Sequence, residues 1–309
     1  MKFSLTILGT SSALPTSSRF PTAHVLNIHE RFFLVDCGEG TQMQLRRMGI
    51  SIASINHIFI SHLHGDHVFG LFGLISTLDL LGRKEDLHIY SYFQLEEILQ
   101  SHLSFFGTDL GYKIIVHSID TRKFQQIYSD KGVEVYSIPL DHRIPTCGFL
   151  FREREPSLNI HKEFISQFGI PLSWITRIKN GEDYLTEDGT LIRNSALTYK
   201  PYFPRSYAFC SDTAFNPSIA KWVEGVDLLY HEATFTEELA GLAKKTGHST
   251  AAQAAQIAKL AGAKKLLLGH FSSRYKDCSI HLSEASAVFE PVIAVKEGDI
   301  FDLPMGNRL

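Results

Sequence analysis

The chain has 309 residues, of which 44% are hydrophobic, and its formal net charge is −3. This length is enough for one large domain or two smaller ones with a substantial core. The charge excludes a globally basic nucleic-acid-binding protein, so contact with RNA requires a local positive surface. No stretch approaches the roughly 20 apolar residues that span a bilayer. The four cysteines form no Cys-x-x-Cys pair. We therefore expect a cytoplasmic protein with reduced thiols and no membrane partner.

The sequence pattern alternates between strands and helices along most of the chain, which is typical of a layered α/β domain. Alternating or β-branched stretches predict strands at residues 3–8, 23–28, 32–35, 58–60, 87–90, 113–117, 133–138, 147–151, 207–210, 227–230 and 265–268. Helical periodicity predicts helices at residues 42–48, 68–81, 94–105 and 249–261, the last with Ser249 or Thr250 as its N-cap.

The stretch from residue 152 to about residue 200 has a different character. Charged residues, prolines and glycines interrupt every long period there, apart from a helical pattern around residues 159–168. We interpret this stretch as an arm inserted into a single domain that covers residues 1–309.

Potential metal ligands and proton carriers follow one predicted strand after another. The side chains at these strand ends are Asp36, His62, His142, Asp212, Glu232 and His270. In α/β domains such side chains gather beyond the ends of the strands. The richest segment is the ligand loop, residues 62–67, in which three imidazoles and a carboxylate lie around Gly65. Imidazole and carboxylate donors without thiolate suit Zn²⁺, although Mn²⁺ or Fe²⁺ can occupy the same donors.

The ligand loop reads His-x-His-x-Asp-His and resembles the signature of the metallo-β-lactamase superfamily. Later His, Asp and His residues follow strands in the order that this superfamily uses. The resemblance implies an α/β fold, a four-layer αββα sandwich, with two Zn²⁺ ions per subunit. The ligands that it implies are His62, His64 and His142 for one metal, Asp66, His67 and His270 for the second, and Asp212 as the bridge between them.

Several further motifs look like those of the short form of ribonuclease Z, a zinc endonuclease that removes 3′ trailers from precursor tRNA. The motifs are GTSS at residues 9–12, DCGEGTQ at 36–42, HEAT at 231–234, HST at 248–250 and HFSSRY at 270–275. The match runs over nearly the whole chain. It implies an endoribonuclease (a phosphodiesterase) that leaves a 3′-hydroxyl on tRNA, acts as a homodimer and has no DNA substrate.

The same resemblance implies catalytic roles for three residues. Asp66 would orient the attacking water and accept its proton, whereas His248, held by Glu232, would donate a proton to the departing ribose oxygen. Arg274 would contact phosphate near the site.

The arm lies where ribonuclease Z carries an exosite that binds the body of the tRNA. The exosite would occupy residues 152–180, and residues 168–173 and 178–183 keep its outline. The usual Gly-Pro-Gly-like turn after Pro171 is missing, and Ser211 stands where the family usually has glycine. The basic loop before the bridging aspartate is short of cations. Because fewer phosphate contacts weaken RNA binding, we expect weaker and less salt-sensitive binding of tRNA. The candidate RNA contacts in this part of the chain are Arg177, Lys179, Lys200 and Arg205.

Two other functions are compatible with the same residues. One is a phosphodiesterase of this fold that acts on small or cyclic nucleotides, for which a remote arm has no evident use. The other is an RNA-binding protein that has lost the chemistry, which the complete ligand set disfavours. A redox di-iron role is also disfavoured, because relatives of that kind usually have Glu at the position of His64.

Overall fold

The computed structural model describes residues 1–14, 16–106 and 110–305. It contains two compact units. The first is built from Met1–Arg152 and Ser206–Leu303, and the second contains Glu153–Arg205. The second unit overlaps the residues that the sequence predicts as an arm. None of the helices in the described ranges is long and apolar enough to cross a membrane.

Two seven-stranded sheets make up the centre of the first unit, counted over its described residues. One sheet has the order β18-β1-β2-β3-β4-β5-β6, and the other has the order β17-β16-β15-β14-β9-β8-β7. The first sheet consists of β1 (Phe3–Gly9), β2 (Ala23–Ile28), β3 (Arg31–Val35), β4 (Ile55–Phe59), β5 (Leu87–Ser91), β6 (Ile114–Ser118) and β18 (Ile300–Asp302). The second sheet consists of β7 (Gln125–Ser129), β8 (Val133–Pro139), β9 (Cys147–Glu153), β14 (Ser206–Cys210), β15 (Leu228–Glu232), β16 (Leu266–Gly269) and β17 (Val292–Ala294).

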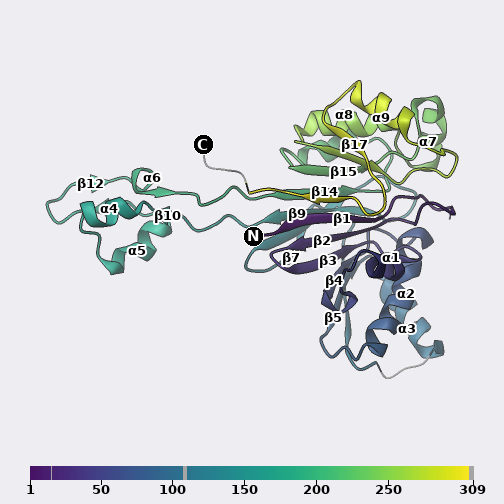
Figure 1. Ribbon diagram of the computed structural model, residues 1–309, viewed down its shortest axis with the longest axis horizontal. Helices are drawn as coiled ribbons and strands as arrows, with labels where there is room; N and C mark the ends of the chain where they lie inside the picture. Colours follow the sequence, from purple (N-terminus) through teal and green to yellow (C-terminus); the bar gives the residue numbers. More distant parts are fainter. Residues whose placement is uncertain (15, 107–109, 306–309) are drawn as a thin grey trace. The chain divides into compact units, whose positions relative to one another are not determined.

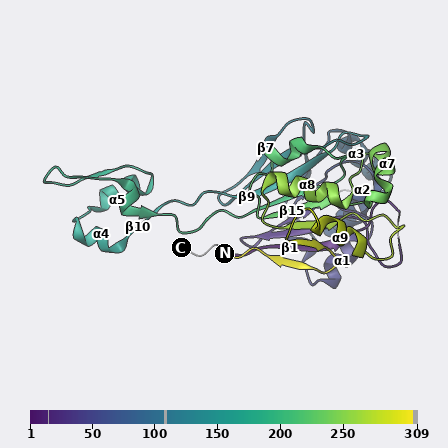
Figure 2. The same ribbon diagram turned by 90° about the horizontal axis from the view of Figure 1, so that it is seen from above.

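Helices cover the outer faces of this pair of sheets, with α1, α2 and α3 on one side and α7, α8 and α9 on the other (Figures 1 and 2). Three apolar cores hold the layers together. The core between the sheets is aromatic and includes Phe59 and Phe149. The helices of this unit are α1 (Thr41–Arg47), η1 (Ile52–Ser54), α2 (Gly65–Leu80), α3 (Gln94–Phe106), η2 (Pro217–Lys221), η3 (Glu237–Leu239), α7 (Ala240–Thr246), α8 (Ala251–Ala261) and α9 (Ser279–Ser286).

Most of the predicted elements of the first unit are present with small changes at their ends. The predicted helix at 68–81 starts earlier, at Gly65, so that Asp66 lies in its first turn. Thr250 is the N-cap of α8 and forms a capping box with Gln253. β15 continues to Glu232, so this carboxylate belongs to the strand instead of following it.

The second unit has a small core of its own. Its elements are β10 (Asn159–Ile160), α4 (Lys162–Gln167), α5 (Leu172–Lys179), β11 (Tyr184–Leu185), β12 (Leu191–Ile192), α6 (Asn194–Leu197) and β13 (Thr198–Tyr199). The buried members of its apolar cluster are Ile160, Ile170, Ile178, Tyr184 and Leu197. The helix predicted around 159–168 is shorter than expected, because Ile160 pairs with Thr198 in a two-stranded sheet before α4 begins.

Candidate metal centre and active site

The ligand loop connects β4 to α2. β4 is parallel to β3 and β5 and ends at Phe59, so the chain leaves the sheet directly before His62. Gly65 opens α2, and a Cβ atom there would lie 2.2 Å from the ring of Phe69. The absence of a side chain at Gly65 therefore lets Phe69 fold back over the start of the helix. The result is a short loop followed by a helical turn, and together they present four polar side chains.

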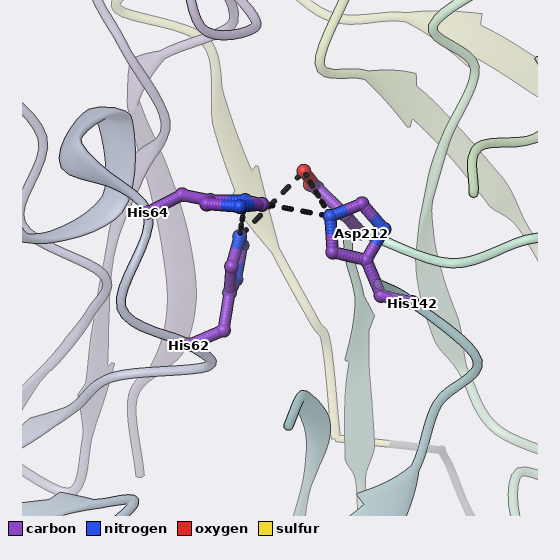
Figure 3. Close-up of side chains that lie close together, drawn as sticks. All are labelled: His62, His64, His142 and Asp212. Atoms are coloured by element: carbon purple, nitrogen blue, oxygen red, sulfur yellow. Dashed lines mark hydrogen bonds and ion pairs between the residues drawn. The ribbon is translucent and has the colours of Figure 1, made fainter. Parts of the chain in front are cut away.

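Three histidines and one aspartate converge in the first cluster (Figure 3). His64 Nδ1 lies 3.0 Å from His62 Nε2 and 3.4 Å from His142 Nε2. Asp212 Oδ2 lies 3.7 Å from His62 Nε2 and 3.9 Å from His142 Nε2. His62 and His64 come from the ligand loop, His142 follows β8, and Asp212 follows β14. The four donor atoms surround one point, as the ligands of a single cation do.

The second cluster uses the other oxygen of Asp212. Asp212 Oδ1 lies 3.4 Å from His67 Nε2 and 3.1 Å from His270 Nε2. Asp66 Oδ2 lies 3.4 Å from His67 Nε2 and 3.5 Å from His270 Nε2. Burial disfavours the charged form of Asp212, but the imidazoles of His270 and His67 outweigh it and hold the pKa of this carboxyl well below its usual range. The ionised carboxylate thus faces both clusters.

In four of the five clustered histidines, the ring nitrogen that faces away from the cluster is fixed by a hydrogen bond. Such bonds set the tautomer and orientation of a metal-binding imidazole. In each case the Nδ1–H donates to an oxygen. The pairs are His62 to Ser61 Oγ at 2.9 Å, His67 to Asp36 Oδ2 at 2.6 Å, His142 to the Gly247 carbonyl at 2.7 Å and His270 to Thr234 Oγ1 at 2.9 Å. Ser61, Thr234 and Gly247 were not found from the sequence, because their role depends on contacts between distant segments.

These residues fit a divalent metal centre. Nε2 of His67 and Nε2 of His270 are buried and have no hydrogen-bond partner among the described atoms. A buried polar atom without a partner is costly, and coordination to a cation removes that cost. The donors are imidazole nitrogens and carboxylate oxygens, without thiolate. This set suits zinc and related divalent ions.

His248 and Glu232 form a charged pair beside the clusters. His248 Nδ1 lies 2.9 Å from Glu232 Oε1, and the Glu232 side chain is fully buried. Burial alone would lower the pKa of His248, but the Glu232 carboxylate outweighs it and raises the pKa to about 9. Glu232 also accepts hydrogen bonds from the backbone N–H of Thr213 at 2.7 Å and of Ser249 at 3.2 Å. The imidazolium therefore persists at neutral pH and can donate a proton.

A cavity of about 580 Å³ opens onto the clusters and is lined by Asp66, Asp212, His248 and His270. Arg274 also lines it, with its Nη1 at 3.2 Å from Ser272 Oγ. A second arginine at this cavity, Arg143, is exposed and was not predicted from the sequence as a site residue. The available signal was its position directly after a predicted ligand.

The other four predicted RNA contacts lie in the second unit, and three of them are engaged by carboxylates. Arg205 is buried and binds Glu153 at 2.6 Å. Arg177 binds Glu182 at 2.7 Å, and Lys200 binds Glu155 at 2.8 Å. Lys179 is half-buried in the last turn of α5.

Comparison with known proteins gives matches over both parts of the first unit. A family model described as anti-Pycsar protein Apyc1 matches residues 3–154, and one described as a beta-lactamase superfamily domain matches residues 202–271. Ribonuclease Z of Bacteroides fragilis is 53% identical over 296 residues, which are 96% of this chain and 97% of that protein. The chain belongs to the ribonuclease Z family.

Further proteins match this chain over nearly its whole length. Ribonuclease Z of Cytophaga hutchinsonii is 45% identical over 305 residues, covering 97% of this chain and 96% of that protein. The crystal structure of the short form of human tRNase Z is 27% identical, has a TM-score of 0.71 and covers 97% of this chain and 99% of that chain. A metallo-beta-lactamase fold protein of Bacillus subtilis has a TM-score of 0.69 at 19% identity, covering 97% of this chain and 99% of that chain. These findings confirm the predicted fold and the assignment to the hydrolases, as an endoribonuclease.

One departure from the usual ribonuclease Z motifs has a local use here. Ser211 is buried, and its hydroxyl donates a hydrogen bond of 2.8 Å to Asp212 Oδ1. A glycine would leave this oxygen without that contact. The serine thus helps to orient the carboxylate that faces both clusters.

Proposed function

We propose that this chain is a dinuclear zinc endoribonuclease that removes the 3′ trailer from precursor tRNA and leaves a 3′-hydroxyl on the tRNA. The observation that carries the proposal is the position of the Asp212 carboxylate between the two histidine clusters. Its Oδ2 faces one cluster and its Oδ1 faces the other. Membership of the ribonuclease Z family supports the choice of substrate. Precursor tRNA is also the partner that we expected from the sequence.

In this proposal His62, His64 and His142 would hold one zinc ion, Asp66, His67 and His270 would hold the second, and Asp212 would serve both. Bound there, two such ions would lower the pKa of water and stabilise the charge that develops in an in-line displacement at phosphorus. Asp66, whose side chain is 6% exposed, orients the attacking water and accepts its proton.

The departing group needs a proton of its own. As the water oxygen bonds to phosphorus, the bond from phosphorus to the ribose O3′ breaks, and O3′ takes a proton from His248. A ribose oxygen is a poor leaving group, so this proton lowers the barrier. The ion pair with Glu232 keeps His248 charged for this step. The phosphate stays with the trailer, and the tRNA ends in a hydroxyl.

The test is to incubate the zinc-loaded protein with a precursor tRNA that carries a 3′ trailer and to map the cut. We expect a single cut after the discriminator base, with a hydroxyl on the tRNA and a phosphate on the trailer. The same preparation should contain two equivalents of zinc by elemental analysis. Hydrolysis of small cyclic nucleotides with an intact precursor would contradict the proposal.

The homodimer that the family resemblance implies and the cytoplasmic location that we expect from the cysteines and the lack of a long apolar stretch remain predictions. Light scattering of the purified protein across a range of concentrations would measure the first, and cell fractionation would measure the second.

A further inference from the structure

Apart from Arg274, the exposed cations beside the candidate active site are not the ones that the sequence pattern suggested. Arg177, Lys200 and Arg205 all bind carboxylates within the second unit. Arg143, Lys244 and Lys245 lie in the first unit and are exposed, and no ion pair within the described ranges involves any of the three. These three residues, which we call the basic rim, are free to bind an external anion.

The basic rim surrounds a second cavity of about 610 Å³. His142 and His248 also line this cavity, so it begins at the candidate active site. Asp66 and His270 line the 580 Å³ cavity described above, but they are not among the residues lining this one. The rim has three cations against a single carboxylate, Asp141, among its lining residues. The electrostatic potential of the rim therefore favours a polyanion.

Local structure fixes the rim relative to the proton donor. Lys244 and Lys245 occupy the last turn of α7, which ends at Gly247 with a φ of 75°. That left-handed residue turns the chain so that its carbonyl accepts the hydrogen bond from His142, and His248 follows directly. The spacing between the two lysines and His248 is thus set by one short, rigid turn.

The chemistry of the proposed reaction indicates which side of the cleaved bond lies in this cavity. The atom that receives the proton of His248 is the O3′ of the last nucleotide that stays in the tRNA. This nucleotide must therefore lie against His248. The phosphate on the 5′ side of this nucleotide extends away from the cleaved bond, and therefore away from Asp66 and His270. Of the two cavities that His248 lines, the one without Asp66 and His270 is the cavity with the basic rim.

We propose that Lys244, Lys245 and Arg143 bind backbone phosphates of the RNA on the 5′ side of the cleaved bond, the side that remains as mature tRNA. This inference rests on the proposed function, because it uses the polarity of that cleavage. The proposal gives the first unit a phosphate-binding surface. In the second unit, three of the four cations expected to bind RNA are already paired with carboxylates.

The test compares Lys244→Gln/Lys245→Gln with the matched control Lys259→Gln. Lys259 is also an exposed lysine in the last turn of a helix, α8, so its loss removes a similar interaction with the helix dipole. Arg143 is left unchanged because it lowers the pKa of His248. We expect the double variant to raise KM for precursor tRNA about tenfold. The slope of log Kd against log salt should fall by about 2.

Mature tRNA, which lacks the trailer, decides on which side the phosphates lie. We expect the double variant to lose the same factor in affinity, relative to the wild type, for mature tRNA as for precursor. A neutral methylphosphonate placed on the 5′ side of the last retained nucleotide should remove most of the difference between wild type and variant, whereas one in the trailer should not.

Two results would overturn the inference. One is a double variant that matches Lys259→Gln in KM and salt slope. The other is a loss of affinity confined to precursor, which would place the contacts on the trailer. A wild-type protein that fails to cut the precursor would instead refute the proposed function, and binding of mature tRNA would still measure the phosphate site.

Discussion

The position of the Asp66 side chain predicts that its loss affects cleavage but not the binding of RNA. Its carboxylate lies within 3.5 Å of two histidines in the second cluster and also lines the cavity that would hold the scissile phosphate. We expect Asp66→Ala to eliminate cleavage, with a loss of at least about 10³-fold in kcat, because it removes both a metal ligand and the proton acceptor. Single-turnover cleavage of precursor tRNA measures this loss.

Retention of RNA binding by Asp66→Ala is the control, since the arm and the basic rim are distant in sequence from the substitution. Filter binding of mature tRNA would show it. Turnover within tenfold of wild type would show that Asp66 has neither role.

The pair formed by His248 and Glu232 predicts a dependence on the leaving group. We expect His248→Ala to slow the cleavage of precursor tRNA by about 10²-fold or more, because O3′ then departs without a proton. An activated aryl phosphodiester, whose phenolate leaves readily, should lose far less. Rates for both substrates under saturating zinc provide the comparison. Equal losses for the two substrates would exclude His248 as the proton donor.

Helix α9 carries a buried histidine that makes the fold sensitive to acid. His281 is fully buried between the rings of Phe271, at 5.2 Å, and Tyr275, at 4.5 Å. Burial lowers its pKa to about 4, whereas an unfolded histidine titrates near 6.5. Between these values the unfolded chain takes up a proton that the folded chain excludes. Stability is therefore present above about pH 6.5 and is lost as the pH falls towards 4.

We expect His281→Phe to flatten this loss by up to about 1.4 kcal/mol per pH unit, the value for one proton. Urea unfolding at a series of pH values from 4 to 8 measures it against wild type, in which the other titrating groups are the same. The prediction concerns the slope, so a uniform loss of stability from the larger ring would not affect it. Identical slopes would contradict it.

The elements that bear the ligands were predictable because each has a strong local signal. The β-branched run before the ligand loop gives β4, and the alanine-rich stretch after Thr250 gives α8. β7, β17 and β18 were missed. They are short strands with no fully buried residue, so their periodicity is weak, and their place in the sheets depends on pairing with distant partners.

The candidate site was predictable to a similar depth. All seven expected ligands lie in the two clusters, and whether they bind metal stays a prediction. They could be named from the sequence because histidines grouped at strand ends are a dense chemical signal. The residues around them gave no such signal. Thr234 matters because its hydroxyl meets His270, 36 positions away in the chain. The carboxylates that pair with Arg177, Lys200 and Arg205 could not be predicted either, since a charged residue in a sequence does not reveal its partner.

At the level of the whole chain, the second unit can be removed without breaking a sheet. Arg152 in β9 and Ser206 in β14 are direct partners in an antiparallel pair. Replacing Glu153–Arg205 by Asn-Gly joins them through a two-residue hairpin turn. We expect this deletion to abolish cleavage of precursor tRNA while hydrolysis of a small activated phosphodiester stays within about threefold of wild type. Parallel assays of the two substrates measure it.

Circular dichroism and zinc content of the deletion protein serve as controls for folding. A deletion protein that loses both activities to the same extent, with intact zinc, would argue against an exosite in the arm. Full cleavage of precursor would do so more directly.

The buried ion pair between Glu153 and Arg205 has a consequence for how the native protein opens. It joins the first and last residues of the second unit, next to a strand pairing that belongs to the first. The small apolar cluster within the arm can therefore lose its structure while the ends of the arm stay fastened. Amide protons of α4 and α5 should then exchange with solvent through fluctuations much cheaper than global unfolding, and those of β9 and β14 should not. The arm is in this sense a cooperative unit of its own, separate from the two sheets that carry the ligand clusters.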